Sequence, residues 1–390
     1  MSALHITDAD VKTKASEYIN EIVEFVNVLM KKGYAYKTKS GNIYFRVNAF
    51  NEYGKLSHRK IEDLLDGVRI ENDEEKEDYA DFALWKSAKE GEIAWKTELG
   101  EGRPGWHIEC SVMALRNLGE TIDIHGGGRD LIFPHHENEI AQSESYTGKM
   151  FAKYWSHCGL IKINGEKMSK SLGNSLTIRE VLEKYNYEVI KYMMFSKHYS
   201  SDIDITESEF KQAENHVYYF YKTIQKMNLI IEKNQLAISN FKKELKLKYD
   251  DLLIKEKFVE AMDDDFGTQN AIGNLHGIFK YVNQLIDSNK NEKDIAPELN
   301  YILNETKEAY KVLGFFEQEP EHFIKQIRDK YLKKINLTEN EIEAKILKRS
   351  EAKKNKNYKK ADEIRNNLKK AGIILNDSKD GTSWDLEELY

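Results

Sequence analysis

The fold follows from Thr121-Ile-Asp-Ile-His-Gly-Gly-Gly128, in which an alternating, β-branched segment runs into three glycines. Such alternation predicts a strand, and the glycines predict a turn. A helical pattern then begins near Pro134. Strand, glycine turn and helix in this order are typical of the carboxyl edge of a parallel α/β sheet, where such folds bind ligands. We therefore expect an α/β fold with a ligand site at this edge.

Upstream of this stretch, apolar residues three and four apart predict a helix over residues 8–32, with Asp10 capping its start and Gly33 ending it. Two short apolar segments flank Ser40-Gly41 and predict a β-hairpin.

Downstream, the pattern is almost wholly helical from Thr177 onward, with long helices over 206–315. One of these helices has an apolar face, formed by Phe210, Val217, Phe220, Tyr221 and Ile224. Residues 345–370 contain eleven Lys or Arg against three Asp or Glu, so this segment is basic within an acidic chain.

Composition narrows the class of protein. The 390 residues are enough for two or three domains. A net charge of −7 argues against nonspecific nucleic-acid binding by the whole surface but leaves room for a local basic patch. Two cysteines exclude a disulfide framework. No apolar run approaches the ~18 residues of a membrane span and no secretory pattern opens the chain, so we expect a cytoplasmic protein.

His135 and Glu139 are four residues apart, so a helix places both on one face. Cys110 offers a thiolate from a second segment. Cysteine, histidine and glutamate together suit zinc better than magnesium or calcium, which prefer oxygen ligands. Taken alone, a histidine and a glutamate at this spacing are more often a surface hydrogen-bonded pair, and a lone cysteine more often fills the core.

Lys167-Met-Ser-Lys-Ser171 lies in a polar loop before a helix. Two lysines and two hydroxyls on a loop can neutralise a triphosphate as pyrophosphate leaves. A solvated surface loop is the alternative interpretation.

This loop resembles the ATP-loop motif of class I aminoacyl-tRNA synthetases, and further segments resemble cysteinyl-tRNA synthetases in the same order. They are Gly102-Arg-Pro-Gly-Trp-His-Ile-Glu-Cys110, Asp123-Ile-His-Gly-Gly-Gly128, Asp130 and Phe133-Pro-His-His-Glu-Asn-Glu-Ile-Ala-Gln-Ser143. The resemblance continues through Met262-Asp-Asp-Asp-Phe266 to the lysine-rich tail and Asp380-Gly-Thr382, so it covers essentially the whole chain.

The resemblance implies a cysteine–tRNA ligase that activates L-cysteine with ATP, as cysteinyl-adenylate, and transfers it to tRNA(Cys). It also implies one zinc ion per chain that binds the substrate thiolate, with Cys110, His135 and Glu139 as ligands. His136 offers a second imidazole but does not match the family ligand. A thiolate–zinc bond excludes serine, which a pocket of similar shape discriminates poorly.

By the same resemblance, Trp106, His107 and Asp130 contact the cysteine or its adenylate. Lys170 and Lys167 are the catalytic and ATP-binding lysines, with Asp130 as a further ATP contact and Mg²⁺ accompanying the nucleotide. Cys158 matches no family ligand, and we expect a semi-buried structural thiol there.

The implied fold is a Rossmann-like parallel sheet of the class I type without its N-terminal strands, followed by an all-α helical bundle and a small C-terminal domain. We expect a connective region at 1–95, the catalytic half with the zinc site and Lys-Met-Ser-Lys-Ser loop at 96–200, a tRNA-binding bundle at 201–315 and a basic domain at 316–390. In the last domain a solvated helix face is the alternative to tRNA contact, which would involve Lys353, Lys354, Lys356, Tyr358, Lys359, Lys360 and Arg365.

The sequence departs from the family pattern at its start, where neither a His-Ile-Gly-His type motif nor one further zinc cysteine is present. From this we expect a fragment, rather than half of a split enzyme or a noncatalytic RNA-binding relative. The isolated chain should be poorly active in cysteine-dependent exchange of pyrophosphate into ATP, and monomeric unless a separate N-terminal chain completes the site. Rival functions are the cysteine ligase of mycothiol synthesis and a noncatalytic tRNA-binding module.

Overall fold

The structure is a computed structural model that describes residues 1–59, 74–168, 173–241, 252–288, 290–378 and 381–387. These residues separate into two units. The site unit comprises Asp8–Leu160 and Ser200–Asp202. The helical unit comprises Met1–Thr7, Ile161–Tyr199 and Ile203–Tyr390. The four regions expected from the sequence stay a prediction.

In the site unit, helix α1 runs from Ile19 to Lys31 and buries its apolar face completely at Ile22, Val26 and Leu29. The predicted end of this helix is confirmed, because Gly33 takes the left-handed conformation that stops it (φ +84°). The predicted start is wrong: residues 8–14 are not helical, and Asp10 caps nothing. The apolar spacing begins only at Ile19, so the earlier residues have no face to bury.

The hairpin predicted around Ser40-Gly41 is confirmed, since β1 (Ala35–Lys37) and β2 (Ile43–Phe45) pair antiparallel. They form one edge of a five-stranded sheet in the order β1-β2-β3-β5-β4, which is antiparallel at every pairing. Its other strands are β3 (Phe82–Ser87), β4 (Trp95–Thr97) and β5 (Gly100–Pro104). Helix α1 packs against this sheet in a core that contains Phe25, Phe45 and Trp85.

The segment of residues 121–128, from which the α/β fold was predicted, forms β6 (Ile122–Gly128). This strand pairs in parallel with β7 (Ala152–Cys158). The parallel pairing is confirmed. The predicted glycine turn is wrong, because Gly126–Gly128 continue the strand and pair with Ser156–Cys158. Beside these strands, α2 (Trp106–Leu118) packs on α3 (Glu137–Thr147).

The helical unit begins with a small sheet of β8 (Ile161–Ile163), β9 (Glu166–Lys167) and β10 (Ile203–Ile205), in which β8 and β10 are parallel. Thr177 starts the next helix, α4 (Ile178–Leu182), through a capping box with Glu180. The helices that follow are α5 (Tyr187–Phe195), α6 (Glu207–Lys233), α7 (Gln235–Phe241), α9 (Ile254–Asp263), α10 (Thr268–Ile286), α11 (Glu292–Tyr310) and α12 (Pro320–Lys334).

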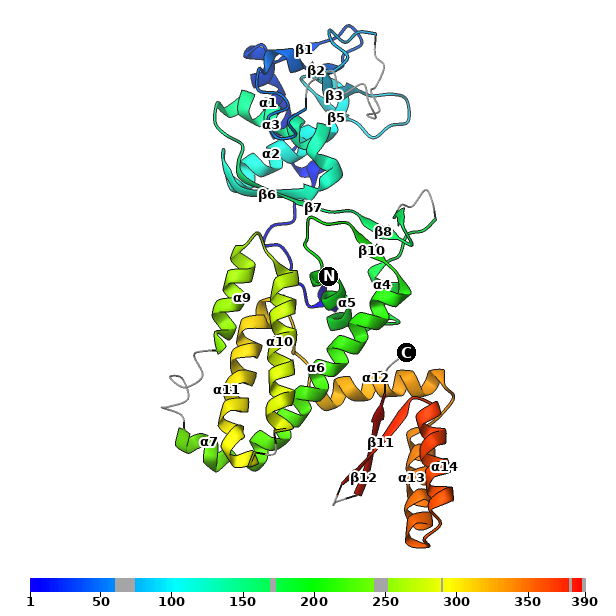
Figure 1. Ribbon diagram of the computed structural model, residues 1–390. Helices are drawn as coiled ribbons and strands as arrows, with labels where there is room; N and C mark the ends of the chain where they lie inside the picture. Colours follow the sequence, from blue (N-terminus) through cyan, green and yellow to red (C-terminus); the bar gives the residue numbers. More distant parts are fainter. Residues whose placement is uncertain (60–73, 169–172, 242–251, 289, 379–380, 388–390) are drawn as a thin grey trace. The chain divides into compact units, whose positions relative to one another are not determined.

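Helix α6 organises this unit, because α5, α10, α11 and α12 all pack on it (Figure 1). The apolar face predicted for this segment is confirmed, since its five residues are all buried: Phe210, Val217, Phe220, Tyr221 and Ile224. None of the helices in the described part of the chain is long and apolar enough to cross a membrane.

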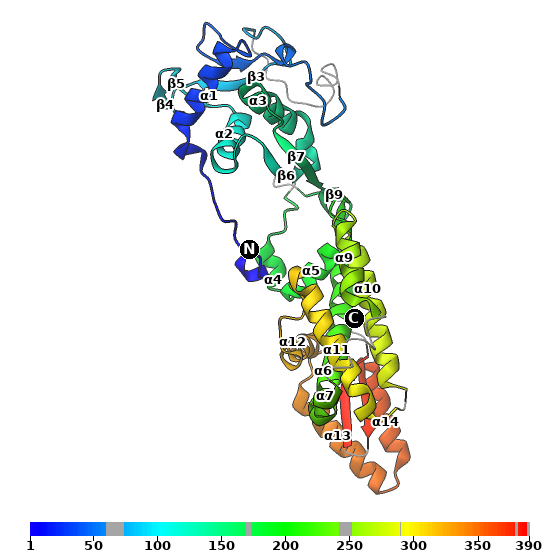
Figure 2. The same cartoon turned by 90° about the vertical axis from the view of Figure 1, so that its left-hand side faces the viewer.

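The unit ends in two antiparallel pairs that lie together in Figures 1 and 2: helices α13 and α14, and strands β11 and β12. Their bounds are Glu339–Lys354, Tyr358–Lys370, Ile373–Ser378 and Gly381–Leu386. Arg349, on α13, is buried and pairs with Asp377 of β11 through two bonds of 2.7 and 2.8 Å. Together with Lys353, at 2.9 Å, it holds the pKa of Asp377 well below its usual range.

A pair of half-buried histidines makes the helical unit sensitive to acid. The rings of His216 on α6 and His276 on α10 lie 4.7 Å apart, and the Tyr192 hydroxyl lies 2.7 Å from Nε2 of His276. Burial, and then the neighbouring His216, lower the pKa of His276 from 6.5 to about 4. Protonation of His276 therefore favours the unfolded chain, so its contribution to stability is present above pH 6.5 and is lost as the pH falls toward 4.

We expect His276→Gln to reduce the loss of stability between pH 7 and pH 4.5 by about 1 kcal/mol, a value discounted for the solvent around a half-exposed ring. Urea unfolding followed by circular dichroism at both pH values measures the change. His322→Gln, at an exposed histidine of α12, is the matched control and should behave as the unchanged protein does. An equal acid loss in the His276→Gln protein would contradict this prediction.

Candidate functional site

The face of the β6–β7 pair that carries His125 is lined with rings. His125 and Gly127 alternate along β6, and their partners on β7 are Trp155 and His157. The His125 ring lies 4.8 Å from the Trp155 ring, in an edge-on arrangement. One side of two neighbouring strands thus presents imidazole and indole groups toward α3.

The segment before α3 brings a further imidazole onto this face. Nδ1 of His136 lies 2.8 Å from Nε2 of His157, and its ring is 4.8 Å from that of His125. A Cβ atom at Gly127 would lie 2.8 Å from Cε1 of His136. Glycine at 127 is therefore what lets His136 lie against the strand.

Glu139, one turn into α3, supplies a carboxylate to the same group. Its Oε2 atom lies 3.0 Å from Nε2 of His125 but makes no hydrogen bond with any described residue, although the side chain is buried. Ligand-capable atoms of His125, His136 and Glu139 all lie within 4.8 Å of one another. A buried oxygen without a hydrogen bond, set between imidazole nitrogens, is suited to a metal ion.

Cys110 approaches this group from α2. The next residue, Ser111, donates a hydrogen bond of 3.5 Å to the backbone oxygen of Glu139. Although Cys110 is an exposed residue, partial desolvation of its thiol, and then the charges of Glu139 and Glu109, raise the pKa of this thiol to about 11. In the absence of a metal the thiol is therefore protonated at neutral pH.

His135 is held by a chain of hydrogen bonds. The Tyr53 hydroxyl donates to Oδ1 of Asn138 at 2.6 Å, Nδ2 of Asn138 lies 3.2 Å from Nδ1 of His107, and Nε2 of His107 lies 2.8 Å from Nδ1 of His135. Burial, and then the neighbouring His135 and His136, lower the pKa of His107 to about 3. The contact with His107 fixes the orientation of the His135 ring, and the Nε2 atom of His135 takes no part in this chain of hydrogen bonds.

The imidazoles of His135 and His136 are neutral at physiological pH. Burial, and then His125, His157 and His135, lower the pKa of His136 to about 4, and burial lowers that of His135. Neutral imidazoles are metal ligands, whereas imidazolium ions are not. With a thiol and a carboxylate nearby, the donor set suits zinc.

The structure thus brings Glu139 together with His125 and His136, whose ligand-capable atoms all lie within 4.8 Å of one another. Cys110 and His135 are not members of that group, although the charge of Glu139 acts to raise the pKa of both. The set Cys110, His135 and Glu139 stays a prediction. His125 was not among the ligands predicted from the sequence, although the structure places it in the group with His136 and Glu139. Its signal was present in the sequence, because period-2 alternation places His125 and Gly127 on one face of the strand.

The other expected site residues lie as follows. Trp106, at the start of α2, is 67% exposed, and its ring is 4.6 Å from that of His135. Asp130 is exposed in the turn after β6, and a Cβ atom at Gly128 would lie 2.6 Å from its Oδ1 atom. Cys158 is an exposed free thiol at the end of β7 rather than the semi-buried one expected.

Of the two loop lysines, Lys167 belongs to the helical unit. Lys167 ends β9 and is exposed, and its backbone oxygen accepts a hydrogen bond of 3.2 Å from Nδ2 of Asn174. Lys170 lies outside the described residues.

Comparisons with known proteins agree over the whole chain. Residues 1–215 match the family described as tRNA synthetases class I (C) catalytic domain, and residues 257–317 match the DALR domain. The chain is 46% identical to "Cysteine--tRNA ligase" of Thermodesulfovibrio yellowstonii over 99% of its own length and 80% of that protein. It is 44% identical to the protein of the same name from Thermococcus onnurineus, over 98% and 78% of the two chains.

Among solved structures, the chain is similar to Mycobacterium tuberculosis methionyl-tRNA synthetase in complex with methionyl-adenylate. The TM-score is 0.55 at 15% identity, over 80% of this chain and 74% of that one. This similarity concerns the fold alone.

Proposed function

Since this chain belongs to the cysteine–tRNA ligase family of class I aminoacyl-tRNA synthetases, we propose that it activates L-cysteine with ATP and transfers the cysteinyl group to tRNA(Cys). One zinc ion would bind the thiolate of the substrate cysteine. The observation that carries this proposal is Oε2 of the buried Glu139 side chain, which makes no hydrogen bond with any described residue and lies among the imidazoles of His125 and His136.

Cys110, His135 and Glu139 are the proposed zinc ligands, and the bound metal would supply a soft centre for a thiolate. The 2.8 Å contact with His107 holds the His135 ring, and zinc binding through Nε2 would require His135 to carry its proton on Nδ1 and to donate it to Nε2 of His107. Exposed Trp106, beside His135, is proposed to cover the amino acid or its adenylate, with His107 and Asp130 as further contacts.

Lys167 and Lys170 are the proposed ATP-binding and catalytic lysines, assisted by Asp130, with Mg²⁺ bound to the nucleotide. For tRNA, we propose the α13–α14 pair, where Lys354, Lys356, Lys359, Lys360 and Arg365 are exposed and Tyr358 is 62% exposed. Lys353 is also exposed, although its ammonium pairs with Asp377. The four regions predicted from the sequence, a monomeric state and a cytoplasmic location complete the proposal.

The test measures ligand binding to the purified, zinc-loaded chain. Cysteine should bind at least 100-fold more tightly than serine, because a hydroxyl cannot replace a thiolate on zinc. Removing the metal with a chelator should abolish this preference. Isothermal titration calorimetry provides both values.

Binding of tRNA(Cys) to the same protein separates the rival functions. A noncatalytic tRNA-binding relative would bind tRNA without the preference for cysteine over serine. A ligase that joins cysteine to an amino sugar would show that preference without binding tRNA. Loss of both properties would refute the proposed function.

A further inference from the structure

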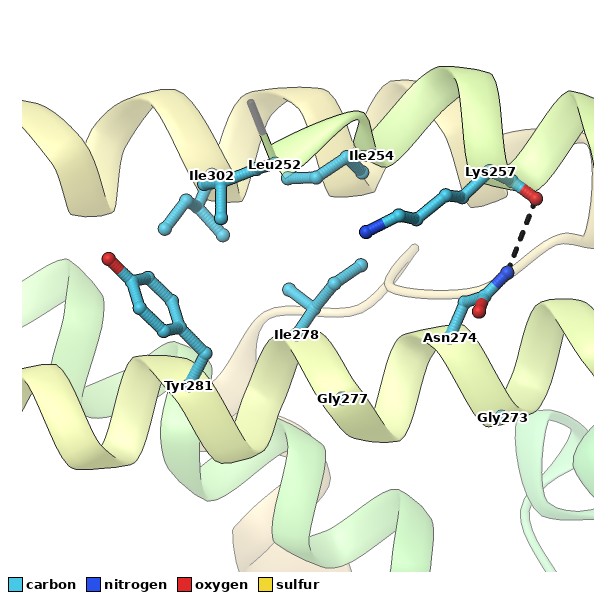
Figure 3. A pocket seen from close by; sticks show the side chains of 9 residues that line it. All are labelled: Leu252, Ile254, Lys257, Gly273, Asn274, Gly277, Ile278, Tyr281 and Ile302. Atoms are coloured by element: carbon cyan, nitrogen blue, oxygen red, sulfur yellow. Dashed lines mark hydrogen bonds between the residues drawn. The ribbon is translucent and has the colours of Figure 1, made fainter. Parts of the chain in front are cut away.

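The helical unit contains a cavity of about 340 Å³ between α9, α10 and α11 (Figure 3). Each helix contributes an isoleucine to it: Ile254, Ile278 and Ile302. The remaining lining residues are Leu252, Lys257, Gly273, Asn274, Gly277 and Tyr281. This volume lies within the range of small-molecule sites and below what a folded partner would fill.

Two glycines keep the α10 wall of the cavity open. Gly273 and Gly277 lie one turn apart in the interior of α10, where glycine is a poor helix former. Close packing does not require them, because a Cβ atom built at either position meets nothing within 4 Å. Their effect is to leave space that any larger side chain would occupy.

An exposed lysine of α9, Lys257, lines the cavity. The side chain of Lys257 extends from α9 along the gap toward Ile278 (Figure 3). In the part of the chain that the structure describes, its ammonium has no ion-pair or hydrogen-bond partner. Its backbone oxygen, by contrast, accepts a hydrogen bond of 3.2 Å from Nδ2 of Asn274, which ties α9 to α10 at this point.

At the Tyr281 end of the cavity, the hydrogen-bonding group of the lining is already paired. The Tyr281 hydroxyl donates a hydrogen bond to the buried carboxylate of Glu298. Between this hydroxyl and Lys257 the walls are aliphatic side chains and bare helix. Among the described residues, the lining is therefore largely apolar and carries one cation, the exposed Lys257.

We propose that this cavity binds a small monocarboxylate with an unbranched apolar tail. The carboxylate pairs with the Lys257 ammonium, and the tail lies along Gly273 and Gly277 against the three isoleucines. A nucleic-acid backbone fits the cavity poorly, because its repeated phosphates would find one cation and several aliphatic side chains.

The test uses octanoate as the probe, below its micellar concentration, with the full-length protein and ligand-observed NMR titration. Octanoate should bind saturably. Gly277→Leu should weaken its binding at least tenfold, because the new side chain fills the cavity. Lys257→Gln should weaken octanoate at least tenfold while leaving the binding of octanol, the neutral analogue, within about twofold.

Lys255→Gln is the matched control, since Lys255 is an exposed lysine of the same helix that does not line the cavity, and it should change nothing. Circular dichroism verifies that each variant is folded, and Gly277→Ala replaces Gly277→Leu if leucine prevents folding. The proposal is overturned if octanoate does not bind, if it binds equally well to Gly277→Leu, or if Lys257→Gln weakens octanoate and octanol alike. A change of sedimentation coefficient in Gly277→Leu would also overturn it, in favour of a second copy of the chain covering the cavity.

Discussion

Replacing Glu188 with alanine should lower the free energy of unfolding of the helical unit by about 3 kcal/mol or more. Glu188, on α5, is completely buried. Its carboxylate accepts hydrogen bonds from the Tyr221 hydroxyl at 2.7 Å, the Phe316 backbone N–H at 2.9 Å and Nε2 of Gln318 at 3.1 Å. Alanine would leave these buried donors without an acceptor, at a cost of roughly 1–3 kcal/mol for each group that water cannot reach.

The effect is large because Glu188 joins three parts of the unit: α5, α6 and the segment after α11. Urea unfolding monitored by circular dichroism provides the free energy. Glu188→Gln retains one acceptor oxygen and should cost less than alanine. Glu183→Ala, at an exposed position shortly before α5, is the matched control and should stay within about 0.5 kcal/mol of the unchanged protein. A loss below 1 kcal/mol for Glu188→Ala would show that water replaces the carboxylate.

Replacing Cys110 with serine should weaken zinc binding at least 100-fold, because it removes the thiolate from the proposed ligand set. The chain offers a matched control in Cys158→Ser, since Cys158 is its other cysteine and is exposed on β7. Competition with a chromophoric chelator measures both affinities. Because the free thiol has a pKa of about 11, binding must release its proton, and the affinity for zinc should rise with pH.

The same experiment distinguishes the two possible ligand sets around Glu139. If the thiolate set holds the metal, Co²⁺ should show thiolate charge-transfer absorption that Cys110→Ser abolishes, and His135→Ala should weaken binding more than His125→Ala. If His125 and His136 hold the metal instead, that absorption is absent and the order of the two histidine variants is reversed. Equal zinc affinity in Cys110→Ser and the unchanged protein would remove Cys110 from the site.

Local patterns in the sequence predicted elements that bury one face by themselves. The spacing of a few neighbouring residues was enough to predict three features: the apolar face of α6, the hairpin around Ser40-Gly41 and the strand before Gly126. The order of the antiparallel sheet does not, because the pairing of β2 with β3 joins residues about forty positions apart. The residues of one strand and its neighbours in the sequence do not indicate which other strand it will pair with.

The sequence predicted those residues of the candidate site that belong to recognisable sequence motifs. Cys110, His135 and Glu139 stand in such motifs, and the alternation along β6 places His125 on one face of its strand, whereas Trp155 and His157 come beside it only when β6 and β7 pair. Glu188 shows the same limit more sharply. In the sequence it is one acidic residue in a helix, and its partners at Tyr221, Phe316 and Gln318 become visible only in three dimensions.

The division of the chain into its two units also sets an order of events during synthesis. The site unit is inserted in the helical unit: the chain leaves the latter after Thr7 and returns to it at Ile161. At translation rates of about 5–20 residues per second, the site unit emerges roughly 10–40 s before β12. Residues 1–7 must wait for that second unit, because His5 stacks on Tyr187 at 4.1 Å and bonds Glu317 at 2.8 Å. Residues 1–7 are therefore synthesised before the site unit, but they can pack against the helical unit only after the site unit has emerged.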